Sequence, residues 1–211
     1  MARCRKQVVL ATRNRGKIVE IKAIFFDDDI DFLSYDDFKD LPEIVEDGRT
    51  FEENAVKKAT EVARLTGRVA LADDSGLEVD ALGGVPGVLS ARFAGDGSSD
   101  EANNLKLLDV MKGIPDGRRG ARFRCVIAVA TPEGDVETTQ GVCEGYIAHE
   151  MRGAAGFGYD PLFVVPDYDK TLAELGPAIK NRISHRAKAL EAVRDILREI
   201  LAARGPDSES C

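Results

Sequence analysis

The chain has 211 residues, of which 44% are apolar and 31% charged, and its formal net charge is −8. These values are ordinary for a globular protein that can bury a sizeable core. The acidic balance argues against general affinity for nucleic-acid backbones, and no apolar stretch approaches the roughly 20 residues that span a bilayer. The apolar run near the N-terminus is too short for a signal peptide, and the four cysteines show no CxxC spacing. We therefore expect a cytoplasmic protein with neither a zinc site nor a disulfide framework.

Strands and helices alternate along the chain. The apolar run "QVVLA" (7–11) predicts a strand, and "GKIVEIKAIFF" then predicts a helix because Ile18, Ile21 and Phe25 recur at helical spacing. A second strand is predicted at "RVALA" (68–72), ending directly before two adjacent acids. This order of elements indicates an α/β protein.

Two further helices are predicted by capping boxes, at Thr50–Glu53 and at Ser98–Glu101. The inward residues expected on the second of these helices are Leu105, Leu108 and Met111. Two long strands flank a Pro-Glu-Gly-Asp turn at 132–135, so part of the sheet is antiparallel. A last helix is predicted from about 184 to 203. No linker divides the chain, so we expect one domain over 1–204, with 205–211 as a disordered tail.

The first polar motif, "TRNRGK" (12–17), lies between the first strand and the first helix. Backbone N–H groups at a helix N-terminus bind anions, and Arg13, Arg15 and Lys17 add positive charge. It is not a Walker A loop, because the first glycine is missing and no Ser or Thr follows Lys17. A solvated basic helix start is an equally good interpretation of this segment alone.

The second motif is Asp73-Asp74-Ser75-Gly76 after the second strand. Successive strand residues point to opposite faces, so the two acids are expected to do different jobs. One can orient the following loop, and the other can reach a divalent cation such as Mg²⁺, which prefers carboxylate oxygen. An Asx-type turn that only ends the strand is the alternative. Ser75 is not expected to be a nucleophile, since the motif is no nucleophile elbow.

The third motif combines "GAAGFGYDPLF" (153–163) with "KNRISHRAKAL" (180–190). Its glycines allow backbone conformations that other residues rarely adopt, and Phe157 and Tyr159 offer faces on which a flat ring can stack. Lys180, His185 and Arg186 are expected to bring hydrogen-bond donors together at the start of the last helix. Backbone N–H groups of the glycine-rich loop are expected to donate to the same ligand. The glycine spacing does not fit a dinucleotide fingerprint. Together the three motifs indicate a site for a nucleoside triphosphate.

With these motifs, and with "TFEENAVKKA" and "ADDSGLEVDALGGVPGVLSARF" between them, the chain resembles the inosine triphosphate pyrophosphatases, also called XTP/dITP diphosphatases. The resemblance covers residues from about 7 to 203. It implies an elongated mixed sheet flanked by helices, with two lobes and an active-site cleft between them, and a homodimer. It also implies Mg²⁺-dependent hydrolysis of ITP, XTP and their deoxy forms to the monophosphate and pyrophosphate, which cleans the nucleotide pool.

The resemblance also implies roles for individual residues. Asp74 would be the catalytic proton acceptor and a magnesium ligand, with Glu46 as the second acid ligand and Glu43 as its rival. Lys58 would reach the triphosphate. The substrate-binding residues would be Thr12, Arg13, Asn14, Arg15, Gly16, Lys17, Ser75, Phe157, Gly158, Tyr159, Asp160, Lys180, His185 and Arg186. Two other classes fit parts of the same pattern, namely a nucleotide sensor without catalysis and a Mg²⁺-dependent phosphatase that removes the terminal phosphate.

Overall fold

A computed structural model of the protein describes residues 6–204, so the predicted tail at 205–211 lies outside the described residues. Within that range the chain forms two compact units. The first unit comprises 6–74, 126–140 and 189–204, and the second comprises 75–125 and 141–188. No helix in the described part of the chain is long and apolar enough to cross a membrane.

Residues 6–204 form seven strands and five α-helices. The strands are β1 (Lys6–Leu10), β2 (Ile30–Leu33), β3 (Ala70–Val79), β4 (Gly120–Ala130), β5 (Val136–Ile147), β6 (Phe163–Val165) and β7 (Lys170–Thr171). The helices are α1 (Arg15–Ile24), α2 (Phe51–Thr66), α3 (Asp100–Val110), α4 (Leu172–Ile183) and α5 (His185–Ala203).

The strands form one sheet in the order β2-β1-β3-β4-β5-β6-β7. The pairs β1–β2 and β1–β3 are parallel, whereas β5–β6 and β6–β7 are antiparallel. Strands β4 and β5 are neighbours joined by a tight turn in which Thr131 N–H donates to the carbonyl of Asp135. The expected α/β fold with a mixed sheet is confirmed. The predicted single domain, its elongated shape and its cleft stay predictions.

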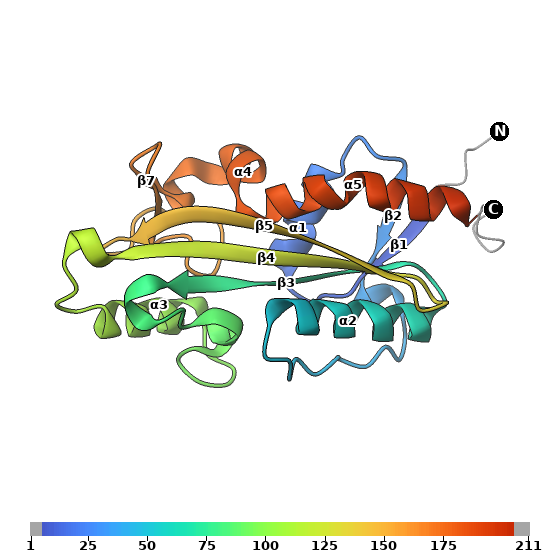
Figure 1. Ribbon diagram of the computed structural model, residues 1–211, viewed down its shortest axis with the longest axis horizontal. Coiled ribbons are helices and arrows are strands. Elements are labelled where there is room, and N and C mark those ends of the chain that lie inside the picture. Colours follow the sequence, from blue (N-terminus) through green and yellow to red (C-terminus); the bar gives the residue numbers. More distant parts are fainter. Residues whose placement is uncertain (1–5, 205–211) are drawn as a thin grey trace. The chain divides into compact units, whose positions relative to one another are not determined.

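In the first unit, helices cover both faces of the sheet (Figure 1). Adjacent residues of β5 show this directly, because alternate strand residues face opposite sides. Thr138 Oγ1 donates to Glu52 of α2, and Thr139 Oγ1 donates to the carbonyl of Ala189 in α5. Arg194 of α5 donates to the carbonyl of Ile24, the last residue of α1, at 2.8 Å, and pairs with Asp28 just after α1 at 2.6 Å. Strand β3 therefore has α2 on one side and α1 with α5 on the other.

Strand β3 is longer than expected. The sequence predicted an end at Ala72, but β3 runs on to Val79, so Asp73 and Asp74 lie inside the strand rather than in an Asx-type turn. Two adjacent acids are tolerated there because each has a lysine partner, as described below. Within β3, residues up to Asp74 belong to the first unit, and residues from Ser75 onward belong to the second.

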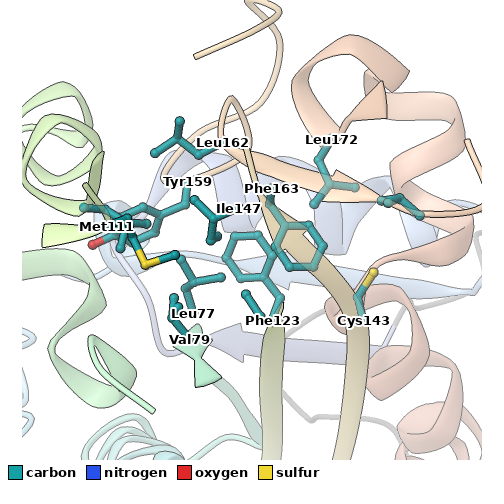
Figure 2. Close-up of a cluster of buried hydrophobic side chains, with 13 residues drawn as sticks. Leu77, Val79, Met111, Phe123, Cys143, Ile147, Tyr159, Leu162, Phe163 and Leu172 are labelled. Atoms are coloured by element: carbon teal, nitrogen blue, oxygen red, sulfur yellow. The ribbon is translucent and has the colours of Figure 1, made fainter. Parts of the chain in front are cut away.

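In the second unit, aromatic and aliphatic side chains from strands, helices and loops form one core (Figure 2). Phe123 of β4 and Phe163 of β6 lie with ring centroids 4.7 Å apart at 53°, a tilted pair. Tyr159 joins this core, and its hydroxyl donates to the carbonyl of Ser90 at 2.9 Å. Residues 159–163 are the end of the first part of the third sequence motif, so the core holds the glycine-rich loop at its C-terminal end.

Helix starts agree with the sequence only in part. Thr50 caps α2 as expected, accepting from Glu53 N–H. Helix α3 is capped by Ser99 and not by Ser98, whose hydroxyl instead donates to the carbonyl of Gly95. Leu105, predicted to face inward, is 53% exposed, while Leu107 is buried. Helix α4 was not predicted, and it ends just before the last helix begins.

Candidate active site

The start of α1 is arranged as an anion site. Asn14 caps the helix and accepts from Lys17 N–H, while Thr12 Oγ1 accepts from Asn14 N–H, each at 3.1 Å. The first turn carries no acid, although acids are usual there. Instead it carries Arg15 and Lys17, so the charge of the side chains adds to that of the helix N-terminus.

The three basic side chains of this segment differ in their contacts. Arg13 lies over the ring of Tyr35, with Cζ 4.7 Å from its centroid, and donates to the carbonyl of Leu41. Arg15 is exposed. Lys17 points to β3, where its Nζ pairs with Asp73 Oδ1 at 2.6 Å. Of the three, only Lys17 is placed next to the acid pair.

Asp73 and Asp74 contact different helices, as their alternation predicts. Asp73 is fully buried and pairs with Lys17 of α1. Asp74 is 6% exposed and contacts α2, accepting from Asn54 Nδ2 at 3.2 Å and from Lys58 Nζ at 3.2 Å. The two carboxylates are thus held on separate sides of the strand.

Lys58 gathers three oxygen atoms around its ammonium group. It donates to Glu46 Oε1 at 2.5 Å, to the backbone carbonyl of Asp73 at 2.8 Å and to Asp74 Oδ1. Glu46, and not its rival Glu43, is therefore the acid that shares a partner with Asp74. We call Glu46, Asp73, Asp74, Lys17 and Lys58 the acid–lysine cluster.

Burial and charge oppose each other in this cluster. Burial raises the pKa of Asp74 above its ordinary value, and the neighbouring Lys58 and Lys17 offset that rise only in part. Burial alone would lower the pKa of Lys58, but the carboxylates of Asp74 and Glu46 outweigh it and raise the pKa. Lys58 is therefore a protonated cation, and Asp74 is a better proton acceptor than an exposed carboxylate.

A second group of side chains surrounds Phe157 in the second unit. Lys180 Nζ lies 4.5 Å from the centroid of the Phe157 ring, and Arg186 Cζ lies 5.5 Å from it. Lys180 also pairs with the buried Asp160, which accepts from Phe157 N–H at 2.9 Å. We call Phe157, Asp160, Lys180 and Arg186 the Phe157 cluster.

Ser75 and His185 lie beside this cluster. Arg186 is 1% exposed, and its Nη2 donates to Ser75 Oγ at 2.8 Å. The ring of His185 stacks on Phe123, with centroids 4.6 Å apart and planes at 11°. Lys180 lies in the last turn of α4, whereas His185 and Arg186 begin α5. The donors therefore come from two helices and not from one helix start as expected.

The comparisons with known proteins agree with this arrangement of elements. The sequence profile of the Ham1 family matches residues 8–196. The chain belongs to the Ham1 family. A "dITP/XTP pyrophosphatase" of Desulforamulus reducens is 53% identical over 194 residues, covering 92% of this chain and 96% of that protein. The protein of the same name from Bacillus subtilis is 50% identical over 192 residues, covering 91% and 97%.

Solved structures of the family have the same fold. The HAM1 protein of Coxiella burnetii superposes with a TM-score of 0.83 at 44% identity, covering 92% of this chain and 99% of that one. The Ham1 protein of Staphylococcus aureus gives 0.82 at 41%, covering 92% and 100%. The family resemblance that the sequence motifs indicated is thereby confirmed.

Magnesium, which the resemblance implies, fits the residues of this Ham1 protein. No group of three or more His, Cys, Asp or Glu residues within 6–204 could hold a metal ion. Mg²⁺ does not need one, because it binds through one or two carboxylates together with waters and substrate phosphates. Glu46 and Asp74 already share one cationic partner, the ammonium group of Lys58. Both carboxylates therefore lie within reach of the same cationic group.

Two expectations about the base pocket need correction. The Tyr159 ring is 3% exposed and packs in the core, so it offers no open face for stacking. The N–H groups of the glycine-rich loop were expected to face a ligand. Phe157 N–H instead donates to Asp160, and Gly158 N–H donates to Asp100 Oδ2 at 2.6 Å. Side chains, rather than these two backbone groups, must supply the donors.

Sequence reasoning missed three polar residues that hold the motifs in place. Asn54 contacts Asp74, and Asp100 and Asn104 hold the N–H and carbonyl groups of Gly158. Asn54 and Asn104 are 1% and 2% exposed. An asparagine on the inward side of a helix is the signal that could have found two of them, because buried amides require partners.

Proposed function

We propose that this protein hydrolyses purine nucleoside triphosphates that carry a 6-oxo base, ITP and XTP with their deoxy forms, to the monophosphate and pyrophosphate. The observation that carries this proposal is the identity of 50–53% over nine-tenths of the chain to proteins named dITP/XTP pyrophosphatase. The acid–lysine cluster and the Phe157 cluster supply chemistry that suits such a substrate. The role that follows is the removal of unwanted triphosphates from the nucleotide pool.

Asp74 is the proposed proton acceptor. It takes a proton from the attacking water, whose oxygen forms a bond to the α-phosphorus while the bond to the bridging oxygen of pyrophosphate breaks. A buried carboxylate with a raised pKa suits this role, provided that it is ionised when substrate binds. Glu46 and Asp74 would hold Mg²⁺, which when bound neutralises phosphate charge and polarises the reacting phosphorus.

The start of α1 and two lysines form the proposed phosphate site. Thr12, Asn14 and Gly16 shape the helix N-terminus, whose N–H groups suit phosphate oxygens. Lys17 and Lys58 then stabilise the negative charge that moves to the leaving pyrophosphate. Both lysines already pair with carboxylates, so substrate and metal would exchange partners with them.

The Phe157 cluster is the proposed base site. The partly exposed Phe157 ring suits stacking against a flat purine, and Lys180 and Arg186 supply donors for the O6 and N7 acceptors of a 6-oxo base. Adenine would direct its 6-amino donor at these donors, and a hydrogen-bonding site rejects such analogues strongly. Ser75 accepts a hydrogen bond from Arg186, and His185, which stacks on Phe123, precedes Arg186 in α5; both are proposed to contact the substrate as well.

The first test is to identify the product formed from ITP. Pyrophosphate with IMP supports the proposal, and EDTA should abolish its formation until Mg²⁺ is restored. Orthophosphate would indicate a phosphatase that removes the terminal phosphate. Binding of ITP with no product would indicate a nucleotide sensor.

We also propose that the protein acts in the cytoplasm as a homodimer and as one two-lobed domain over 1–204. The support is the family resemblance. Light scattering on the purified protein tests the dimer, since a mass near 23 kDa would mean a monomer, given 22.9 kDa for the chain.

A further inference from the structure

Residues 46–49 are each held by a side chain of α2. The four α2 residues follow in the reverse order of the residues they hold, so the segment lies antiparallel to the helix. The contacts are Lys58 Nζ to Glu46 Oε1 at 2.5 Å, Lys57 Nζ to Asp47 Oδ1 at 2.6 Å, Gly48 N–H to Asn54 Oδ1 at 2.8 Å and Arg49 N–H to Glu53 Oε2 at 2.6 Å.

This segment belongs to no helix or strand. Regular strand or helix hydrogen bonds do not fix its position, and each of its four residues has a contact with an α2 side chain. These contacts therefore contribute to the position of the Glu46 carboxylate. Lys57 and Asp47 are both more than one-third exposed, so their ion pair contributes little by itself.

Asn54 is the contact that also reaches Asp74. Its side chain is 1% exposed and uses both ends of the amide, because Oδ1 accepts from Gly48 N–H while Nδ2 donates to Asp74 Oδ2 at 3.2 Å. A single buried amide thus links the segment that carries Glu46 to the Asp74 carboxylate. Buried amides with both ends paired are held in one orientation.

Gly48 is required at its position for space. A Cβ atom there would lie 2.6 Å from Asn54 Oδ1 and 2.9 Å from Glu53 Cβ, closer than real Cβ contacts occur. Its φ lies outside the left-handed region, so alanine would be acceptable to the backbone itself. Even one methyl group would therefore push the segment away from α2 at Asn54.

We propose that Gly48 and Asn54 are positioning residues that hold the Glu46 and Asp74 carboxylates in register for one Mg²⁺ ion. The inference rests on the proposed function in that these two acids are the metal ligands. Neither Gly48 nor Asn54 needs to contact substrate. Their action goes through the acids, as that of an outer shell of metal-site residues does.

The test compares Gly48→Ala with Gly117→Ala. Gly117 is a matched control because its added Cβ meets nothing within 4 Å and its φ is also outside the left-handed region. We expect Gly48→Ala to raise the Mg²⁺ concentration for half-maximal ITP hydrolysis about tenfold, the low end of outer-shell effects. At saturating Mg²⁺ most turnover should return, and the KM for ITP should change less than twofold. Gly117→Ala should match the wild type.

A second measurement does not depend on activity. The amide hydrogens of residues 48 and 49 donate to α2 side chains, so Gly48→Ala should speed their exchange with solvent about tenfold relative to the wild type. Lys57→Met, which removes only the exposed ion pair, should shift the Mg²⁺ dependence less than twofold.

The two measurements separate the possible failures. Faster exchange at 48 and 49 with an unchanged Mg²⁺ dependence would overturn the proposal, since the segment would then be released without consequence. Unchanged exchange would also overturn it. A wild type without ITP hydrolysis would count against the proposed function instead, and the exchange result would still report on the contacts themselves.

Discussion

The acid–lysine cluster and the Phe157 cluster both contain buried ion pairs between lysines and carboxylates, but their net charges have opposite sign. In the first, three carboxylates surround two ammonium groups, Lys17 and Lys58. In the second, Lys180 pairs with the carboxylate of Asp160, and both Lys180 and Arg186 lie near the ring of Phe157. The first cluster has an excess of negative charge, and the second has an excess of positive charge.

This difference suits the different ligands that we propose for the two clusters. Excess carboxylate attracts a divalent cation and the phosphates that bind with it, whereas excess donors attract the acceptor edge of an oxo-purine. In both clusters a cation is buried beside its partner, which costs little only while the pair stays intact. Substitutions that remove one partner should therefore have separable effects on chemistry, base preference and stability.

The largest expected effect is that of Asp74→Asn. The amide is nearly isosteric but cannot take a proton, so kcat for ITP should fall by about 10²–10⁴, the usual contribution of a general base. Initial rates at saturating ITP and Mg²⁺ measure this. Near-normal turnover would remove Asp74 from the proposed catalytic role.

Asp73→Asn is the internal control for that substitution. It leaves Lys17, whose side chain is 13% exposed, without its buried carboxylate partner. Unfolding free energy should drop by about 3 kcal/mol, while kcat falls less than tenfold. If the two variants exchanged these phenotypes, the roles given to the two acids would have to be exchanged as well.

Base preference tests the Phe157 cluster. The wild type should hydrolyse ITP and XTP far better than ATP, and Arg186→Ala should reduce the ratio of ITP to ATP kcat/KM by about 10–100-fold. The ratio cancels any general loss from the cavity that the buried arginine leaves. Arg182→Ala provides the control, since Arg182 is exposed and lies only four residues away. A ratio that Arg186→Ala leaves unchanged would contradict the donor assignment.

Lys17 tests the phosphate side with a smaller expected effect. Lys17→Ala should weaken ITP binding about tenfold more than IMP binding, because the lost charge faces the β- and γ-phosphates. The comparison of two ligands on one variant removes the contribution of the lost ion pair between Lys17 and Asp73. Lys22→Ala, at the far end of the same helix, should affect neither ligand. Equal losses for ITP and IMP would place Lys17 away from the triphosphate.

Much of the fold follows from local patterns. The runs 7–11 and 68–72, the cap at Thr50 and the turn at 132–135 each have a short-range physical cause, and the structure has those elements. The continuation of β3 past Asp74 has no such signal. Asp73 pairs with Lys17, which lies 56 residues away in the sequence, and Asp74 pairs with Lys58, which lies 16 residues away. These ion pairs stabilise the acids inside the strand.

The site was predictable as motifs but not as contacts. Lys17, Lys58 and Glu46 could be selected from their residue types, yet the sequence could not show which acid each lysine would meet. The contact of Asp100 could not be predicted for the same reason, because its partner Gly158 lies 58 residues away in the sequence. Short motifs identify the chemistry, while pairing over such separations is decided by the tertiary fold.

Tyr159 gives the smallest and most local test of the comparison. Its ring lies in the core of the second unit (Figure 2). Its hydroxyl donates to the carbonyl of Ser90 at 2.9 Å. Burial raises the pKa of this hydroxyl far above its ordinary value, so it stays protonated and remains a donor. Tyr159→Phe should therefore lower the unfolding free energy by about 1–2 kcal/mol, the effect of one buried hydrogen bond.

The KM for ITP decides what that loss means. If Tyr159 only anchors the Phe157 loop from within the core, KM should stay within about twofold of the wild type after Tyr159→Phe, because Asp100 and Asn104 still hold Gly158 from the other side. Chemical denaturation and ITP kinetics on the same preparation provide both numbers. A large rise in KM with little loss of stability would mean that Tyr159 contacts the base, as the sequence predicted. The base pocket would then extend further into the core than the contacts of Phe157 indicate.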